Sequence, residues 1–360
     1  MKKPTVVTLF AGCGGDTLGF VNAGFELVFA NDNNPDACKT LKDRFEKKGK
    51  KIVHKGNIEK QENFSTANVI TGGFPCQGFS LAGPRKVEDK RNRLYQELKR
   101  AIRLVNPDFI VAENVKGFVT IGEKSKSKYF HNGKIVKLGV VAQGIVDELS
   151  AVGKGYTVKY ELHNAKDFGI PQDRERIIIV GVRRDLDFKF EFPEPTHGKN
   201  LKDYVSMKDA KIDKIKFDNE KDVFRERKST RKDYFSSRYM SRNRIRNWNE
   251  VSFTIPAEAS QVPANPNCKK MWNIDVTGMN RPKDSEWAEF IKNHAKDIAK
   301  DLVRMSWRQC AAIQGFPENY PFSGDIQSKY KQIGNAVPPP LMEVIAKNIM
   351  PFYDGKKLSF

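Results

Sequence analysis

The sequence predicts a doubly wound α/β domain of Rossmann-like topology, with a second, smaller domain inserted into it. Short apolar runs alternate with segments of helical spacing through the first half of the chain, as buried parallel strands and their crossover helices do. Glycine or polar residues follow each apolar run. They indicate ligand-binding loops, because folds of this class bind ligands at the carboxyl ends of their strands.

The expected strands and helices follow from these patterns in chain order. The strands are Val6–Phe10, Leu27–Asn31, Val69–Gly72, Phe109–Ala112 and Ile177–Val182, and the helices are Asn92–Val105, Val140–Val152 and Leu341–Met350. The run Phe192–His197 is rich in proline, and a lysine- and arginine-rich stretch without clean periodicity follows it. We therefore expect one domain over residues 1–192, an inserted domain over 193–325, and a segment 326–360 that returns to the first domain.

The net charge indicates a polyanionic partner. Lysine and arginine total 63 against 44 acidic residues, a formal charge of +19, and such an excess attracts nucleic acid through phosphate neutralisation. A lysine-rich solvated surface explains the charge equally well, so motifs must decide between the two.

Other sequence features narrow the class of protein. The five cysteines are scattered and form no C-x-x-C pair, which argues against a disulfide framework and a structural metal site. No apolar run approaches the roughly 20 residues that span a bilayer, and the first strand begins too early to follow a signal peptide. We therefore expect a cytoplasmic protein without a membrane segment.

The turn after the first strand is a candidate cofactor site. It reads Phe10-Ala-Gly-Cys-Gly-Gly15, and its glycines would let the backbone approach a ligand closely. A dinucleotide fingerprint would need a third glycine at Thr17, so a dehydrogenase is disfavoured. Asp32, at the tip of the next strand, could accept hydrogen bonds from ribose hydroxyls. On these residues alone, a nucleoside-bearing cofactor and an ordinary tight turn with a helix cap are equally good explanations.

Three further strand ends carry reactive groups. The loop Gly72–Ser80 exposes Cys76 between Pro75 and Gln77, as a nucleophile would be. Glu113-Asn114 follows a neighbouring strand and places a carboxylate at the same edge of the sheet. The alternating arginines of Gln172–Arg176 would project from one side of an extended segment and hold an anion near the cysteine.

Together these segments resemble the motifs of the cytosine-C5 DNA methyltransferase family, in the family's order from Phe10 to Leu341. Arg304–Pro317 and Gly334-Asn-Ala-Val-Pro-Pro339 extend the resemblance. Within the family, Met240–Glu250 and Ser252–Ile255 are most similar to the bacterial restriction-modification enzymes related to the HaeIII methyltransferase.

The resemblance implies an S-adenosylmethionine-dependent enzyme with a smaller DNA target-recognition domain. Cys76 is then the nucleophile that adds to cytosine C6, Glu113 contacts the N3 edge of the base, and Arg174 and Arg176 support the site. Because C5 and C6 are inaccessible in a stacked duplex, the cytosine must be flipped out. The cofactor-binding residues implied are Phe10, Ala11, Gly12, Gly14, Gly15, Asp32, Asn57, Ile58, Pro75, Leu94, Asn335 and Ala336.

For the DNA, the residues expected to bind it are Gln77, Ser80, Arg242, Arg244, Arg246 and Gln261. The expected partners are duplex DNA and a cognate restriction endonuclease of the same site, and the chain is expected to act as a monomer without a metal. The recognised bases stay open, because Ser260 replaces the arginine that the HaeIII-like pattern carries before the glutamine.

Four positions depart from the family pattern: Asn57, Asn92, Gln309 and Ala312 replace a usual Asp, Gly, Glu and Arg. Two alternative functions also stay open: a tRNA-methylating relative and a catalytically silent DNA-binding homologue. The long basic insert favours DNA over tRNA. Retention of Cys76, Glu113 and both arginines favours an active enzyme.

Overall fold

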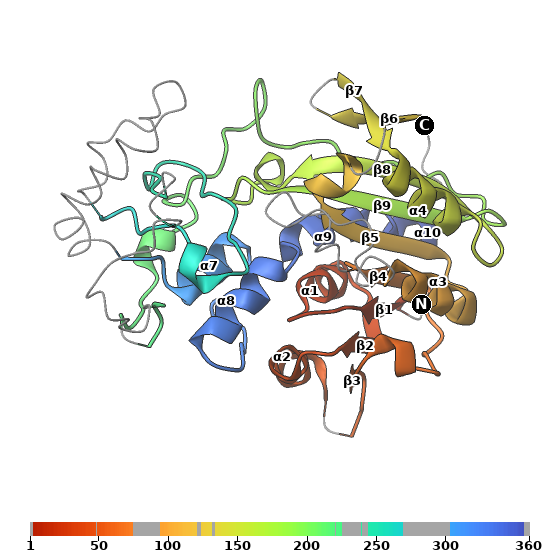
Figure 1. Ribbon diagram of the computed structural model, residues 1–360, viewed down its shortest axis with the longest axis horizontal. Coiled ribbons are helices and arrows are strands. Elements are labelled where there is room, and N and C mark those ends of the chain that lie inside the picture. The colour runs from red at the N-terminus through yellow and green to blue at the C-terminus, as the bar shows by residue number, and fades with distance from the viewer. Residues whose placement is uncertain are drawn as a thin grey trace.

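The computed structural model describes residues 3–47, 49–74, 94–120, 124–131, 134–219, 221–224, 239, 244–268 and 303–355. Its centre is a seven-stranded sheet in the order β3-β2-β1-β4-β5-β9-β8 (Figure 1). The strands are β1 (Thr5–Leu9), β2 (Glu26–Asp32), β3 (Val53–Lys55), β4 (Val69–Gly72), β5 (Phe109–Val115), β8 (Tyr156–Asn164) and β9 (Glu175–Arg183).

The helices confirm the doubly wound α/β class. They are α1 (Gly15–Asn22), α2 (Pro35–Phe45), α3 (Tyr95–Val105), α4 (Val140–Ser150), α7 (Trp307–Ile313), α8 (Ile326–Asn335), α9 (Pro339–Lys347) and α10 (Met350–Tyr353). Alternate residues of each strand face opposite sides of the sheet. Val7 and Ile70 pack with α3 and α4, whereas Val6 and Val69 pack with α1, α2 and α9.

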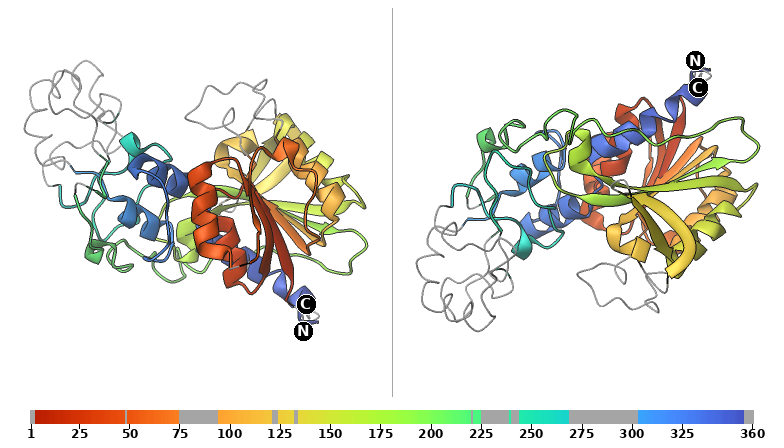
Figure 2. Two further views of the ribbon diagram at one scale, coloured as in Figure 1. Left: turned by 90° about the horizontal axis from the view of Figure 1, so that it is seen from below. Right: turned by 90° about the horizontal axis from the view of Figure 1, so that it is seen from above.

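The C-terminal helices complete the second face of the sheet. α9 packs against α1, and Figure 2 shows these blue helices beside the red N-terminal elements. The segment after residue 325 therefore contacts the first strands of the chain. The N-terminal and C-terminal segments of the chain therefore pack against each other.

Chain order reverses beside β1. The chain runs from β1 outward through β2 to β3, then returns to β4 on the other side of β1. In a doubly wound sheet this switch point opens a crevice at the carboxyl ends of the strands, where ligands bind. The glycine turn after β1 lies at this point.

The sheet departs from the parallel arrangement that the sequence predicts. β9 runs antiparallel to both β5 and β8. Its central residues are buried like those of the other inner strands, so an apolar run carries no sign of strand direction. β8 is not among the expected strands, because its half-exposed residues form no continuous apolar run. The separate hairpin of β6 (Lys124–His131) and β7 (Lys134–Gly139) is also not among them.

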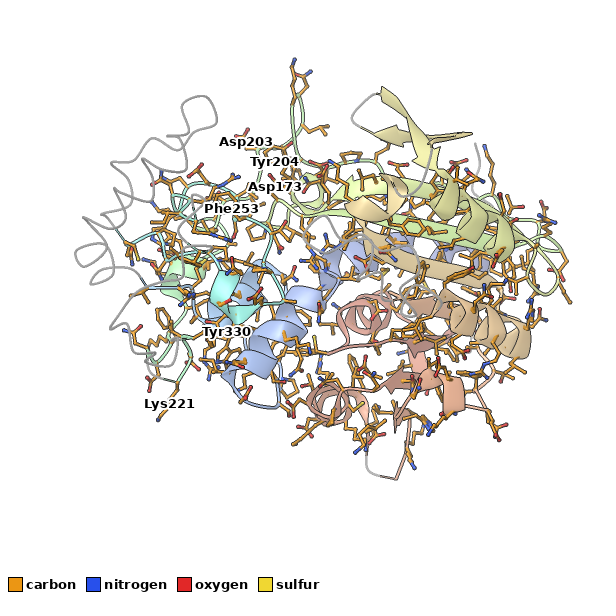
Figure 3. The ribbon with its side chains drawn as sticks, viewed as in Figure 1. Asp173, Asp203, Tyr204, Lys221, Phe253 and Tyr330 are labelled. Carbon is orange, nitrogen blue, oxygen red and sulfur yellow. The ribbon has the colours of Figure 1, made fainter. Side chains whose placement is uncertain are left out.

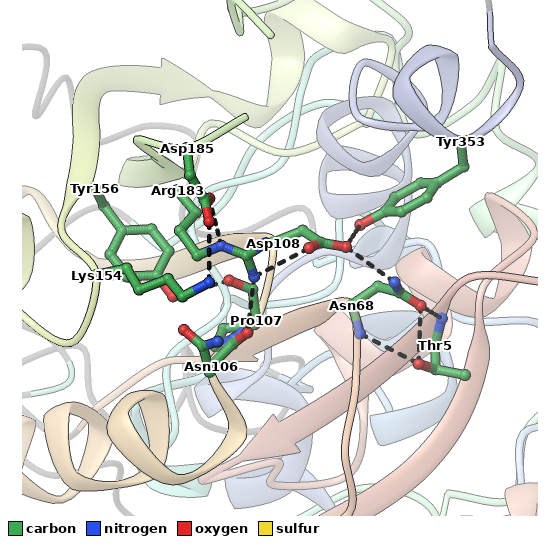
Figure 4. Close-up of polar contacts among 10 residues, drawn as sticks. All are labelled: Thr5, Asn68, Asn106, Pro107, Asp108, Lys154, Tyr156, Arg183, Asp185 and Tyr353. Carbon is green, nitrogen blue, oxygen red and sulfur yellow. Dashed lines mark hydrogen bonds and ion pairs between the residues drawn. The ribbon is translucent and has the colours of Figure 1, made fainter. Parts of the chain in front are cut away.

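A polar network ties the C-terminal helix to the amino ends of the strands (Figure 4). The Asp108 carboxylate accepts hydrogen bonds from Asn68 Nδ2 at 2.9 Å and from the Tyr353 hydroxyl at 3.1 Å. It also pairs with Arg183 Nη1 at 3.2 Å. One carboxylate therefore holds β4, β9 and α10 together at the edge opposite the crevice.

We expect Asp108→Ala to lower the free energy of unfolding by about 2–3 kcal/mol, since three partly buried partners lose their acceptor. Denaturant unfolding followed by circular dichroism measures this loss. Asp185→Ala is the matched control, because Asp185 pairs with the same Arg183 but is 43% exposed; it should leave the transition unchanged. Equal effects of the two variants would contradict the role of Asp108.

In the described part of the chain, no helix has the length and hydrophobicity needed to cross a membrane.

Candidate active site

A cavity of about 610 Å³ lies at the carboxyl ends of β1, β2, β4 and β5, and residues of α8 close one side. It brings together most of the described residues predicted to bind the cofactor, with Glu113 in the same lining. These are Phe10, Ala11, Gly12, Gly15, Asp32, Asn57, Ile58, Leu94, Asn335 and Ala336. Residues more than 300 positions apart in the chain thus form one site.

The turn after β1 opens toward the cavity. Phe10 and Gly12 adopt positive φ angles of 52° and 53°, a conformation that costs a non-glycine residue of order 1–2 kcal/mol. A Cβ added at Gly12 would meet nothing within 4 Å. The backbone of Gly12 therefore faces open space in which a ligand can approach it closely.

Asp32 fixes this turn to the tip of β2. Its carboxylate accepts hydrogen bonds from the backbone N–H groups of Gly12 and Asn34, each at 2.8 Å. Burial raises the pKa of Asp32, while these hydrogen bonds and the charge of Lys331 oppose the rise. The lone pairs that remain on the carboxylate oxygens can accept hydroxyl donors of a ligand in the cavity.

Of the predicted cofactor residues that the structure describes, only Gly14 does not line the cavity. Gly14 instead turns toward α2, where an added Cβ would stand 2.7 Å from the Leu41 side chain. Pro75 lies outside the described residues, as do Cys76, Gln77, Ser80 and Arg242.

Several cavity residues escaped the sequence analysis: Asp16, Asn31, Asn33, Asn34, Ser328, Lys331 and Gln332. Three of them lie within two residues of Asp32, and two lie within three residues of Gly334. Proximity to those motifs was the signal that could have identified them.

Glu113 pairs with Arg176 inside the site. Arg176 Nε lies 2.8 Å from Glu113 Oε1, and both side chains are 12% exposed. Burial raises the pKa of Glu113, and the charges of Arg176 and Arg174 oppose the rise. A Cβ added at Gly73 would stand 3.0 Å from Glu113 Oε2. The carboxylate therefore lies against the backbone that leads to Pro75-Cys76.

Arg174 is placed differently from the anion-holding role that the sequence suggested. Its guanidinium is buried and donates to three backbone carbonyls, those of Ile255 at 3.1 Å, Gly334 at 2.9 Å and Ala336 at 2.9 Å. These bonds join the start of β9 to α8 and to the segment around Ile255. Arg174 thus stabilises the site indirectly, by connecting three backbone segments through hydrogen bonds.

The segment Ser252–Ile255 is hydrogen-bonded to the residues that precede β9. Asp173 N–H donates to the Ser252 carbonyl at 2.8 Å, and Ser252 N–H donates to the Pro171 carbonyl at 3.0 Å. Figure 3 shows Asp173 and Phe253 near each other at this junction.

Arg244 and Arg246, both expected to bind DNA, contact different partners in the structure. Arg244 donates to the Gln261 side-chain oxygen at 2.6 Å and lies 5.1 Å from the Tyr239 ring. Arg246 instead lies 4.3 Å from the Phe253 ring. Arg244 and Gln261, both expected to bind DNA, therefore form a hydrogen bond with each other in the free protein.

The model of one family, C-5 cytosine-specific DNA methylase, matches residues 5–351. The chain belongs to this family. It is 36% identical to the Type II methyltransferase M.BspRI of Lysinibacillus sphaericus, over 97% of this chain and 82% of the relative. It is also 36% identical to M.MthTI of Methanothermobacter thermautotrophicus, over 97% and 98% of the two chains. The chain is therefore a DNA cytosine-C5 methyltransferase.

Solved structures share the fold of this methylase. A DNA modification methyltransferase encoded within an E. coli prophage superposes with a TM-score of 0.63 at 21% identity, covering 98% of this chain and all of the other. The methyltransferase EhMeth of Entamoeba histolytica gives 0.62 at 18% identity, over 99% of this chain and all of the other.

Two departures of this methylase from the family pattern, Gln309 and Asn57, form local hydrogen bonds, and Asn92 lies outside the described residues. Gln309 completes a capping box with Ser306 at the start of α7, a role that glutamine fills as glutamate does. Asn57 accepts a hydrogen bond from Glu59 N–H at 3.1 Å and donates to the Glu59 carboxylate at 2.9 Å. Its side chain is thus partly occupied within its own turn, although the residue lines the cavity.

Proposed function

We propose that the enzyme binds S-adenosylmethionine in the cavity and methylates C5 of a cytosine flipped out of duplex DNA. One observation carries this proposal: Glu113, held by Arg176, opens into the same cavity as the β1 turn and Asp32. A cofactor held by the turn and a base held by Glu113 would therefore meet in one enclosed space.

The cavity fits this cofactor in size and chemistry. Its volume of about 610 Å³ lies within the range of small-molecule sites. Gly12 offers open backbone to the methionine end, Asp32 offers acceptors to the ribose hydroxyls, and Ile58 offers an apolar surface to the adenine. Phe10, Ala11, Gly15, Leu94, Asn335 and Ala336 complete the proposed binding set, with Pro75 and Gly14 kept from the sequence analysis.

The protein groups prepare the cytosine for alkylation. When bound, S-adenosylmethionine supplies an electrophilic methyl group. The Cys76 thiolate adds to cytosine C6, and the protonated Glu113 carboxyl donates toward N3, which makes C5 a carbon nucleophile. After methylation, loss of the C5 proton re-forms the double bond and expels the thiolate. The Arg176 charge holds Glu113 in place through this sequence.

Residues 193–325 are proposed to bind the duplex and recognise the target site, with Arg242, Arg244, Arg246, Gln261, Gln77 and Ser80 among the contacts. The charge of +19 supports a phosphate-binding surface. We further propose that the enzyme acts in the cytoplasm as a monomer and protects DNA from an endonuclease of the same specificity. The relatives named as Type II methyltransferases support this role.

Asp32→Ala should weaken binding of S-adenosylmethionine by about 10- to 100-fold, the loss expected for charge-assisted hydrogen bonds to the ribose. Isothermal titration calorimetry measures the change. Asp43→Asn, which removes an exposed carboxylate on α2 away from the cavity, should bind normally. Unchanged affinity in Asp32→Ala would mean that the ribose lies elsewhere.

The substrate is tested by methyl transfer from labelled S-adenosylmethionine to duplex DNA and to tRNA in parallel. We expect label in DNA alone, and bisulfite sequencing of DNA from expressing cells should show one short methylated site. Label in tRNA alone would favour the tRNA-methylating alternative. Absence of transfer to both would favour a silent homologue; neither alternative is supported by the family relatives.

A further inference from the structure

Asp16 is a buried acid that the mechanism above does not use. It is 5% exposed and lines the cavity next to Gly15, in the first turn of α1. One carboxylate oxygen, Oδ1, accepts a hydrogen bond from Thr17 N–H at 2.8 Å. In the part of the chain that the structure describes, no lysine or arginine forms an ion pair with it.

A buried carboxylate without a cation is unfavourable, because desolvation disfavours its charged form. Burial raises the pKa of Asp16 to about 7, and the charge of a second acid, Glu113, contributes to the rise. Glu113 differs in having Arg176 at 2.8 Å. Of these two acids, Glu113 is thus paired with a cation, whereas Asp16 lacks one from the described protein.

The position of Asp16 indicates which part of a ligand would supply the cation. Asp32, at the tip of β2, accounts for the ribose, whereas Asp16 directly follows Gly15 of the β1 turn and lines the same cavity. Because the proposed function assigns this turn to the methionine end of the cofactor, Asp16 lies toward that end. That end carries an α-ammonium group, whose N–H donors match a free carboxylate oxygen; a sulfonium has no such donors.

We propose that the Asp16 carboxylate binds the α-ammonium group of the cofactor's methionine moiety. This inference rests on the proposed function and adds to it a specificity-determining residue. The enzyme then selects cofactors that retain a charged amino-acid end. Ligands that end at the thioether, and therefore lack the amino-acid group, gain no binding affinity from Asp16.

Three ligands separate the parts of the cofactor in a calorimetric test. S-adenosylmethionine carries both a sulfonium and an ammonium group. S-adenosylhomocysteine has the ammonium group but no sulfonium, and 5′-methylthioadenosine lacks the whole amino-acid end. Asp16→Asn should weaken the first two by about 10- to 100-fold and change binding of the third by less than about twofold. Retained binding of 5′-methylthioadenosine also shows that the variant cavity is folded.

The release of protons when the cofactor binds gives a second measurement. The cavity also holds Glu113 from β5, Asp32 from β2 and Lys331 from α8, so only the comparison with Asp16→Asn isolates Asp16. Binding of a cation favours the ionised carboxylate, so wild-type protein should release part of a proton near pH 7, and its affinity should rise from pH 6 to 7.5. Asp16→Asn should lack this release.

Asp43→Asn is the control, because it removes an exposed carboxylate on α2 that lies outside the cavity lining; it should keep its affinity for S-adenosylmethionine. Equal weakening in both variants, loss of 5′-methylthioadenosine binding in Asp16→Asn, or weakening confined to S-adenosylmethionine would each overturn the ammonium assignment. Normal binding by Asp16→Asn would also overturn it, while leaving the proposed function intact. Failure of the wild-type protein to bind any of the three ligands would overturn both.

Discussion

Cys76→Ala should abolish methyl transfer, with a fall in rate of about 10⁴-fold or more, because alanine removes the thiolate that is proposed to add to cytosine C6. The placement of Glu113 supports this expectation. Its Oε2 atom lies against Gly73, and Phe74, the residue after Gly73, is followed directly by Pro75-Cys76. The proposed nucleophile is therefore attached to backbone that borders the base-binding carboxylate.

The measurement is single-turnover methylation of a duplex that carries the target site. The variant should still bind S-adenosylmethionine and DNA, because alanine changes neither the charge of the cavity nor its cofactor residues. Cys38→Ala serves as the control, since Cys38 is buried on α2 and is absent from the cavity lining. Substantial activity in Cys76→Ala would exclude Cys76 as the nucleophile.

Glu113→Gln should reduce the rate of methyl transfer by about 10²- to 10⁴-fold, the usual contribution of a positioned general acid. An amide keeps the shape of the side chain but cannot give a proton to N3. Because burial raises the pKa of Glu113, the wild-type carboxyl keeps its proton to higher pH than an ordinary glutamic acid does. The wild-type rate should therefore fall as pH rises through that pKa, and Glu113→Gln should lack this fall.

Glu175→Gln provides the matched control, because Glu175 lies next to Arg176 in sequence but pairs with Lys116 at 2.7 Å. It should transfer methyl groups at the wild-type rate. A pH profile of Glu113→Gln identical to that of the wild type would assign the ionisation to another group.

The sequence predicted the inner strands and the crevice well, because the residues that specify them are close together in the sequence. Buried apolar runs ending in glycine or a polar residue identify β1, β2, β4 and β5 to within a few residues. Motif order then identified Asp32, Glu113 and Asn335, which all line one cavity.

Features that depend on distant contacts could not be predicted in the same way. The direction of β9 depends on its pairing with β8 and β5, which burial alone does not encode. The role of Arg174 depends on carbonyls of Ile255, Gly334 and Ala336, up to 162 positions away. Asp16 had no distinguishing pattern, since an acid in the first turn of a helix is common.

The central claim, covalent methylation of cytosine through Cys76, is tested most directly with duplex DNA that carries 5-fluorocytosine at the target position. Fluorine at C5 blocks the elimination that frees the enzyme. In the presence of S-adenosylmethionine, we expect a protein–DNA adduct that survives denaturation, and peptide mass spectrometry should place the DNA on Cys76. Methylation of normal DNA without any trapped adduct, or an adduct on another residue, would contradict the mechanism.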